Sequence, residues 1–328
     1  MEDYIIKDGC FAAFMEETVE PFLARRRKAF RIPREDGKSL YFVRYEAADA
    51  IGTVVISHGF TETAEKYLEM VYYFLKNHYH VYLPEHCGHG RSYRLVEDLS
   101  LVHIDRYERY VRDLVAVAGV AKREHPEKPL FLFAHSMGGG IGLAALSAQP
   151  ELFDRAVLSS PMVRPLTGSL SWPRAKFLAN ILCRMGKAEQ YLPDGHPFDG
   201  KECFEDSAAT SRERFEYYQK KRNTQPLYQM SAASCGWLNE AARLNRALTR
   251  DCWKRIRTPM YMFQAESDAF VSGEEQDRFA EKVKSAGKTS IEKTRAAGTK
   301  HEIFGSGEQV QRVCWEQILR FFSKKPAV

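Results

Sequence analysis

A single serine lies in the stretch of the chain that is best suited to chemistry. Ser136 is part of Ala134-His-Ser-Met-Gly138, after the apolar run 130–133 and before the helix-forming run 141–146. A buried strand that turns sharply into a helix, with serine at the turn, is the context of a nucleophile elbow. The turn strains the backbone and requires small neighbours, which Gly138 and the two glycines after it provide. The alternative is a glycine-rich turn whose serine has no chemical role.

A serine hydroxyl is a weak nucleophile, so a catalytic serine needs a base and an acid from elsewhere in the chain. His301 lies in a loop before the last predicted helix, and Asp268 follows a predicted strand at 259–264. Glu266, two residues nearer that strand, competes for the role of the acid. The order serine, acid, histidine is the one that an elbow enzyme requires. We therefore predict Ser136 as the nucleophile, His301 as the general base and Asp268 as the residue that orients the imidazole.

Two backbone amides are predicted to complete this site. The β-branched run 53–57 indicates a strand buried on both faces, and it ends in His58-Gly-Phe-Thr-Glu62. Gly59 permits a turn there, so that the amide of Phe60 points into the site beside the amide of Met137. Such a pair forms an oxyanion hole. The histidine of this motif is expected to be structural and bonded to the loop backbone, because His301 is the better base.

The loop 85–92 contains His86, Cys87 and His89, three side chains of types that bind metals. No second cluster of ligands completes a zinc site, and none of the seven cysteines forms a Cys-x-x-Cys pair. We therefore expect no metal and no cofactor, and we interpret the loop as a rigid brace for the serine turn. Cysteines without a pairing pattern are typical of free thiols in a reducing compartment.

Strands alternate with helices along most of the chain. This alternation predicts an α/β fold with a mostly parallel central sheet flanked by helices, and one early antiparallel strand. The expected strands are residues 39–45, 53–57, 80–84, 130–133, 155–161, 259–264 and 289–294. The expected helices are residues 65–77, 104–124, 273–284 and 307–323, together with the run after Ser136.

The alternation breaks between residues 163 and 235, where two short helical stretches are expected at 174–185 and 211–221. An insertion at this point is typical of a lid over the active-site edge of the sheet. The alternative is a set of ordinary helical connections that pack on the body. We expect a core of residues 1–162 and 236–328 and a helical cap of residues 163–235. The candidate substrate contacts are His58, Gly59, His135 and the lid residues Phe177, Ile181, Phe215 and Tyr218.

The 328 residues carry a net charge of +5, with both signs mixed along the chain. This excess is too small to indicate a nucleic-acid partner. No apolar run reaches the ~18 residues of a spanning helix, and the acidic start is unlike a secretory signal. We expect a cytoplasmic protein; no pattern indicates its oligomeric state. Residues 11–28 are expected to form a loosely attached amphipathic segment on the body, with peripheral contact at the inner membrane face as the alternative.

Several motifs resemble those of the α/β-hydrolases of the monoacylglycerol lipase and lysophospholipase branch, above all the bacterial PldB-type lysophospholipases. They are Ala134-His-Ser-Met-Gly-Gly139, Gly88-His-Gly-Arg-Ser92 and residues 104–114, 209–215, 264–266 and 301–303. The loop before Gly88 departs from the family pattern, with Glu85-His-Cys87 where the family has Asp at the start and Arg at the end. The resemblance implies a triad of Ser136, Asp268 and His301 and a helical cap from residues 163–235.

The residues and the resemblance together predict a serine hydrolase. Its expected substrate is a small lipid-like acyl ester, a lysophospholipid or a monoacylglycerol, cleaved through an acyl-Ser136 intermediate. An amidase or aminopeptidase with the same triad is the alternative, because the same groups can cleave amides. A third reading is a catalytically silent ligand-binding protein on the same scaffold.

Overall fold

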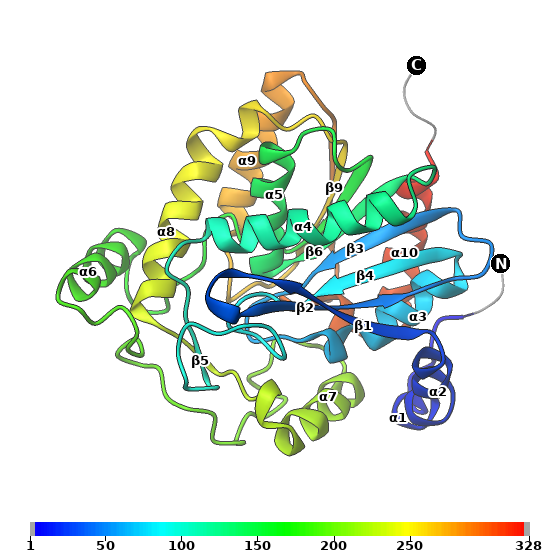
Figure 1. The fold of residues 1–328 in the computed structure, drawn as a ribbon, viewed down its shortest axis with the longest axis horizontal. Helices are drawn as coiled ribbons and strands as arrows, with labels where there is room; N and C mark the ends of the chain where they lie inside the picture. Colours follow the sequence, from blue (N-terminus) through cyan, green and yellow to red (C-terminus); the bar gives the residue numbers. More distant parts are fainter. Residues whose placement is uncertain (1–3, 325–328) are drawn as a thin grey trace.

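An eight-stranded sheet runs through the centre of the computed structural model, which describes residues 4–324 (Figure 1). The strand order is β1-β2-β4-β3-β6-β7-β9-β10. β1 and β2 are antiparallel to their neighbours, and the strands from β4 to β10 are parallel. The strands are β1 (Arg27–Pro33), β2 (Ser39–Tyr45), β3 (Gly52–Ser57), β4 (Tyr79–Pro84), β6 (Leu130–His135), β7 (Arg155–Ser159), β9 (Met260–Ala265) and β10 (Ile291–Ala296). The predicted α/β fold with a mostly parallel sheet is confirmed.

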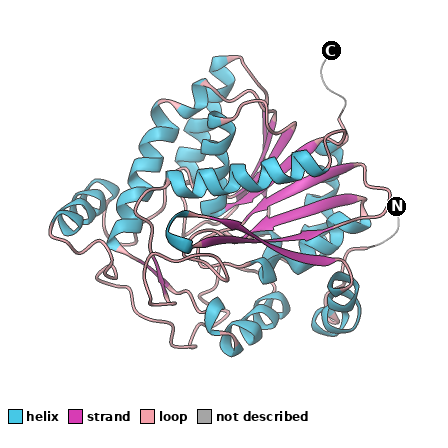
Figure 2. Cartoon of the chain, in the orientation of Figure 1, coloured by secondary structure: helices cyan, strands magenta, loops and turns pink. Residues whose placement is uncertain are grey.

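Helices cover both faces of this sheet (Figure 2). Successive side chains of a strand point to opposite faces, so Val55 packs in one hydrophobic cluster while Val54 and Ile56 pack in the other. The first cluster includes α4 (Glu108–Glu124), α5 (Ser136–Ala148), α8 (Cys235–Arg250) and α9 (Gly273–Ala286). The second includes α3 (Leu68–Lys76) and α10 (Glu308–Phe322). Burial on both faces explains why the central strands are continuous apolar runs.

Four elements, β1, α8, β5 and β8, were not predicted from the sequence. β1 has mostly exposed or half-buried side chains, so it lacks the apolar alternation of a half-buried strand. α8 does carry a helical apolar stripe, and its buried side chains include Trp237, Ala241 and Leu244. β5 (Leu101–Val102) and β8 (Ala232–Ala233) are two-residue strands that pair in a separate small sheet, and they are too short to leave a pattern.

The segment before β1 is firmly packed, and the prediction that residues 11–28 are loosely attached is wrong. α1 (Phe11–Phe14), a π-helical turn (Met15–Val19) and α2 (Glu20–Ala24) form one helical stretch. Its apolar side chains Met15 and Val19 are fully buried, in the cluster that contains α3. Of the basic end of the segment, Arg25 and Arg26 form a turn, and Arg27 and Lys28 are the first residues of β1.

Between β7 and α8, the chain forms two longer helices, α6 (Trp172–Arg184) and α7 (Arg212–Thr224). α6 packs on α8 at one end of the molecule, and α7 lies against α1. Both helices were predicted, within two or three residues at each end. Among residues 4–324, no helix combines the length and apolarity that crossing a bilayer requires.

Candidate active site

Ser136 lies on a strained turn between β6 and α5. Its φ of 52° is in the left-handed region, which costs energy for a residue with a side chain. The turn brings the start of α5 close to neighbouring backbone. A side chain at Gly138 would lie 2.2 Å from the carbonyl oxygen of Ser57, and one at Gly139 would lie 2.7 Å from Cα of Pro161. Both positions therefore require glycine, as the sequence suggested.

The structure brings the three predicted catalytic side chains into one hydrogen-bonded row. His301 Nε2 lies 2.8 Å from Ser136 Oγ, and His301 Nδ1 lies 2.8 Å from Asp268 Oδ2. With the proton on Nδ1, the imidazole donates to Asp268 and accepts from the Ser136 hydroxyl. Each residue follows a strand, and parallel strands end at the same edge of a sheet, so side chains up to 165 positions apart meet there.

Asp268 is held as an ionised carboxylate. Burial alone would raise its pKa, but the hydrogen bond and charge of His301 and the amides of Val271 and Phe270 lower the pKa below its ordinary value. These amides donate to Asp268 Oδ1 at 3.0 Å and 2.9 Å. Glu266, the alternative candidate for the catalytic acid, accepts instead from the amide of Gly298 at 2.8 Å.

Backbone contacts fix the loop that carries His301. The hydroxyl of Ser160 donates to the carbonyl oxygen of His301 at 2.9 Å, and Ser160 has a φ of 44°. The ring of His135 lies 5.0 Å from the ring of His301, and its Nδ1 lies 3.1 Å from the carbonyl oxygen of Ser159. His135 is buried behind His301, so the structure places it as a support for the base.

Buried groups shape the loop after β3 on both sides of Phe60. The amide of Gly59 donates to Glu62 Oε2 at 2.6 Å, and the amide of Thr61 donates to His89 Nε2 at 3.3 Å. Within residues 4–324, the amide of Phe60 contacts no acceptor. Met137 is the second residue of α5, a position whose amide has no acceptor within the helix. Both predicted oxyanion-hole donors are therefore available.

His58 is a structural histidine, as preferred from the sequence, and it does not face a substrate. Its ring is fully buried, with Nδ1 2.8 Å from the carbonyl oxygen of Gly59 and Nε2 accepting from the amide of His86 at 2.8 Å. Burial lowers the pKa of His58 to about 4, so the ring is neutral. A side chain at Gly59 would lie 2.7 Å from Glu62 Oε2, so this position has room only for glycine. Contrary to the prediction, both residues support the loop rather than contact a substrate.

Of the four lid residues predicted to contact a substrate, only Tyr218 reaches a loop of the candidate site. Phe177 and Ile181 are 69% and 36% exposed, on the face of α6 that points away from α8. Phe215 packs against Phe204, with ring centroids 5.9 Å apart. Only Tyr218 reaches the loop after β3, where its hydroxyl lies 3.3 Å from Thr63 Oγ1. The apolar stripe of α6 therefore does not line the candidate site.

The loop 85–92 braces the site with an ion pair and buried histidines. Glu85 accepts from the guanidinium of Arg91 at 3.1 Å and from the amide of Ala64 at 3.2 Å, although burial raises its pKa. Cys87 stands in the hydrophobic core, and burial raises the pKa of its thiol. Among the residues that the structure describes, no group of three metal-binding side chains is suited to hold an ion.

An ionic network that the sequence analysis missed joins the two loops of the site. Lys66 Nζ lies 2.9 Å from Glu62 Oε1 and 2.5 Å from Glu302 Oε1. Burial would raise the pKa of Glu62, but the charge of Lys66 holds this pKa well below its ordinary value. The position of Glu302 directly after His301 was the one signal available in the sequence.

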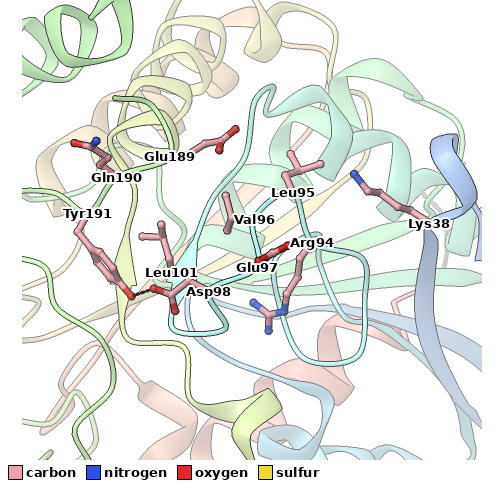
Figure 3. A pocket seen from close by; sticks show the side chains of 10 residues that line it. All are labelled: Lys38, Arg94, Leu95, Val96, Glu97, Asp98, Leu101, Glu189, Gln190 and Tyr191. Atoms are coloured by element: carbon pink, nitrogen blue, oxygen red, sulfur yellow. Dashed lines mark hydrogen bonds between the residues drawn. The ribbon is translucent and has the colours of Figure 1, made fainter. Parts of the chain in front are cut away.

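A surface pocket of about 700 Å³ lies apart from this site (Figure 3). It is formed by the loop 94–101, Lys38 and residues 189–191, and the hydroxyl of Tyr191 donates to Asp98 Oδ2 within it at 2.5 Å. None of Ser136, Asp268 and His301 lines it. Its acidic and basic side chains are mixed, so it indicates no ligand class.

The sheet, the strained serine turn and the row of three side chains define an α/β-hydrolase. Residues 48–308 match the family described as "Serine aminopeptidase, S33", and the chain belongs to this family. The family match and the curated lysophospholipase and monoacylglycerol lipase relatives together confirm the predicted branch and the predicted enzyme class, a carboxylic ester hydrolase.

Curated relatives and solved structures agree with this assignment. Lysophospholipase L2 of Escherichia coli is 27% identical over 98% of this chain and 95% of its own length. The monoglyceride lipase homolog of Monkeypox virus is 30% identical over 66% of this chain and 70% of its own length. A thermostable carboxyl esterase from Bacillus coagulans has a TM-score of 0.74 at 17% identity, covering 90% of this chain and 98% of that one. At this identity the solved structure supports the fold alone.

Proposed function

We propose that the protein is a serine hydrolase that cleaves carboxylic esters of single-chain lipids, lysophospholipids or monoacylglycerols, through an acyl-Ser136 intermediate. The observation that carries the proposal is the row from Ser136 through His301 to Asp268, with two distances of 2.8 Å. The names of the relatives, lysophospholipase and monoglyceride lipase, support this substrate class.

The reaction follows from the geometry of the row. His301 Nε2 takes the proton of the Ser136 hydroxyl as Oγ attacks the ester carbonyl, and Asp268 stabilises the resulting imidazolium. The amides of Phe60 and Met137 donate to the oxyanion, and each such donor lowers the barrier by about 3 kcal/mol. His301 then protonates the leaving alcohol, which departs and leaves acyl-Ser136. Water attacks the acyl group by the same route and frees the acid.

The surroundings of the row favour an apolar substrate. The ring of Phe270 lies 5.1 Å from the ring of His301, and the ring of Phe60 lies 4.5 Å from that of Trp237. An aminopeptidase would need an anionic group for the substrate's ammonium. Glu62 and Glu302 share Lys66 as their ion-pair partner, so each carboxylate is already paired, although one negative charge remains on the three groups together. Segment 163–235 is proposed as the cap, because Tyr218 of α7 contacts the loop beside the site.

The seven cysteines are free thiols, which supports the expected cytoplasmic location. No pair of them forms a disulfide, so the fold does not depend on an oxidising compartment. We propose on this basis that the enzyme works in the cytoplasm, where single-chain lipids would reach it from the membrane.

Substitution of Ser136 tests the proposal. In Ser136→Ala, turnover of p-nitrophenyl butyrate should fall by at least about 10⁴-fold, because the nucleophile is removed. Ser147→Ala, a buried serine of the same helix, serves as the matched control and should keep its activity. A fluorophosphonate probe should label the wild type and the control but not Ser136→Ala. Unchanged turnover in Ser136→Ala, or an unlabelled wild type, would contradict the mechanism.

The substrate class needs a separate comparison. Rates on a lysophospholipid, a monoacylglycerol and an N-acyl amide of the same chain length are measured with the wild type. Hydrolysis of either ester at least about tenfold faster than the amide supports the lipid esterase. Faster hydrolysis of the amide would favour the amidase alternative, because the triad chemistry is common to both.

A further inference from the structure

The segment that leads into α7 is bonded to the loop of the proposed base. The amide of Glu302, the residue directly after the base, donates to the carbonyl oxygen of Ala208 at 2.9 Å. In the other direction, the amides of Thr210 and Ser211 both donate to the carbonyl oxygen of Gly305, at 3.2 Å and 3.0 Å. Backbone hydrogen bonds therefore tie the proposed cap to the loop that follows the base.

Side chains add to the same contact. The hydroxyl of Thr210 donates to Oγ of Ser306 at 2.8 Å, and Ser306 is fully buried. A side chain at Gly305 would lie 3.1 Å from Cβ of Ala209, so the two backbones approach closely. Breaking a hydrogen bond to a buried group leaves that group unpaired, which costs more than the bond itself contributes. The contact therefore holds the loop in one position.

The residues that make this contact belong to a motif that the proposed reaction does not use. Residues 209–215 are one of the stretches that resemble the hydrolase branch. None of them is a member of the triad or a donor of the oxyanion hole. Their bonds to the loop after His301 supply the missing role, because that loop determines where the imidazole lies.

Arg214 anchors the segment to two other parts of the molecule. Its guanidinium contacts Glu69 of α3 at 2.7 Å and Asp8 at 2.9 Å. It also lies over the ring of Phe11, 4.5 Å from the ring centroid. Arg214 is 6% exposed, and the side chain of Glu69 is 11% exposed. Removal of the arginine would leave a buried carboxylate without its partner, so this anchor is strong.

Asp8 continues the contacts back toward the base. The carboxylate that pairs with Arg214 also accepts from the amide of Glu308 at 3.0 Å, at the start of α10. Contacts thus run from the loop of His301 through the segment before α7 to Arg214 and Asp8, and on to the helix that follows the loop. Asp8 lies outside residues 48–308, which match the family, so the amino-terminal segment of this chain supplies part of the anchor.

We propose that residues 208–214 are a positioning element for the base: their backbone holds the loop of His301, and Arg214 holds the backbone. The inference rests on the proposed function, which makes His301 the base. Arg214 is a positioning residue, since it touches none of the reacting groups. A displacement of about 1 Å between the base and Ser136 can cost about 100-fold in rate. The proposed cap is therefore part of the catalytic geometry as well as a cover for the site.

Replacement of Arg214 tests the anchor. In Arg214→Met, kcat on p-nitrophenyl butyrate should fall at least about tenfold while KM stays within about threefold, because the base moves and the substrate contacts remain. Arg222→Met is the matched control. Arg222 is a buried arginine of the same helix, also 6% exposed, and it donates to the carbonyl oxygens of Tyr228 and Met230. Its kcat should stay within about threefold of the wild type.

A cross-link across the contact provides a rescue. The hydroxyl oxygens of Thr210 and Ser306 are 2.8 Å apart, a spacing that a disulfide can bridge. Thr210→Cys/Ser306→Cys is made with the exposed Cys10 and Cys203 replaced by serine, and is oxidised with glutathione disulfide. In Arg214→Met, oxidation should raise kcat at least about fivefold and reduction should reverse the gain. With Arg214 intact, the oxidised form should be at least as active as the reduced form.

Amide hydrogen exchange distinguishes this proposal from the proposed function, because it needs no turnover. Exchange in residues 302–306 should be at least about tenfold faster in Arg214→Met than in the wild type or in Arg222→Met. Ser136→Ala should exchange like the wild type, so a failure of the hydrolase assignment would leave this result intact. Asp8→Ala removes the exposed partner of Arg214 and should change kcat and exchange in the same direction by less. It replaces Arg214→Met in both measurements if that variant does not fold.

Any of four results would overturn the proposal. The first two are a kcat of Arg214→Met close to that of the wild type and an equal loss of kcat in Arg222→Met. The third is a cross-link that leaves the kcat of Arg214→Met unchanged, or that abolishes activity when Arg214 is intact. The fourth is unchanged exchange of residues 302–306 in Arg214→Met.

Discussion

Lys66 donates a 2.5 Å hydrogen bond to Glu302, the residue that follows His301 in the chain. The same ammonium group lies 2.9 Å from Glu62, whose other carboxylate oxygen accepts from the amide of Gly59. One half-buried cation therefore joins the loop that is predicted to bind the oxyanion to the loop that carries the predicted base. The distance between these two loops sets the distance between the groups that act on a substrate.

Replacement of Lys66 should slow the reaction more than it weakens substrate binding. Lys66→Met leaves two carboxylates without their shared cation, so both loops shift, and kcat should fall by about 10- to 100-fold. Lys66→Arg retains the charge and should recover most of kcat. The measurement is kcat and KM on p-nitrophenyl butyrate.

Lys300→Met is the matched control for Lys66→Met. Lys300 directly precedes His301, but its ammonium contacts the carbonyl oxygens of Glu205 and Ser207 rather than the network. Its kcat should stay close to that of the wild type. A wild-type kcat in Lys66→Met would show that Lys66 has no positioning role.

Asp268→Asn should be nearly inactive. The amide nitrogen of asparagine cannot accept from Nδ1–H of His301, so the imidazole takes the wrong tautomer; a loss of about 10⁴-fold in kcat is expected. Glu266→Gln tests the competing carboxylate, which contacts the Gly298 amide and not His301. It should retain activity within a few-fold. The reverse ranking of the two variants in a steady-state assay would make Glu266 the acid.

Gly90→Ala should destabilise the fold more than Gly168→Ala. Both glycines have positive φ, 50° and 58°, so both substitutions carry a backbone cost of about 1 kcal/mol. A side chain at Gly90 would also lie 2.2 Å from the buried carboxylate of Glu85, whereas Gly168 has open space. We expect Gly90→Ala to cost at least about 2 kcal/mol more, measured by urea denaturation. Equal midpoints for the two variants would refute this reading of the loop.

The folded protein should lose stability as the pH falls from 7 to 5. Burial lowers the pKa of His58 from 6.5 to about 4, so the unfolded chain binds a proton in this range that the folded chain does not. Stability is therefore complete above about pH 6.5 and decreases toward pH 4, by about 2 kcal/mol between pH 7 and 5 for His58 alone. Burial also lowers the pKa of His86 and His89, in the same direction.

Urea denaturation at pH 7 and pH 5, at constant ionic strength, measures this loss. Burial raises the carboxyl pKa of Glu85 and Asp113, which acts in the opposite direction, and the larger shifts of the histidines decide the sign. The midpoint should be lower at pH 5. A midpoint that is equal or higher at pH 5 would mean that the histidines are protonated in the folded state.

The predicted elements were most accurate where local patterns are strong. The run 53–57 became β3 and the run 273–284 became α9, because continuous burial and helical amphipathicity leave distinct spacings. β1 was not predicted, because its side chains are mostly exposed or half-buried. Residues 11–28 were predicted to be loosely attached, because the residues they pack against lie far away in the sequence. Val19 is buried in a cluster that also contains Trp315.

The amino-acid sequence by itself determined the type of fold and the order of Ser136, Asp268 and His301, because strand–turn–helix patterns are local and parallel strands end at one edge. Only the tertiary structure decided which polar groups meet. Lys66 and Glu302 are 236 residues apart, and His58 proved to be enclosed by backbone rather than open to a substrate. Contacts of this kind depend on how several elements pack together, and packing distances of a few ångströms are not encoded in the spacing of residues along the chain.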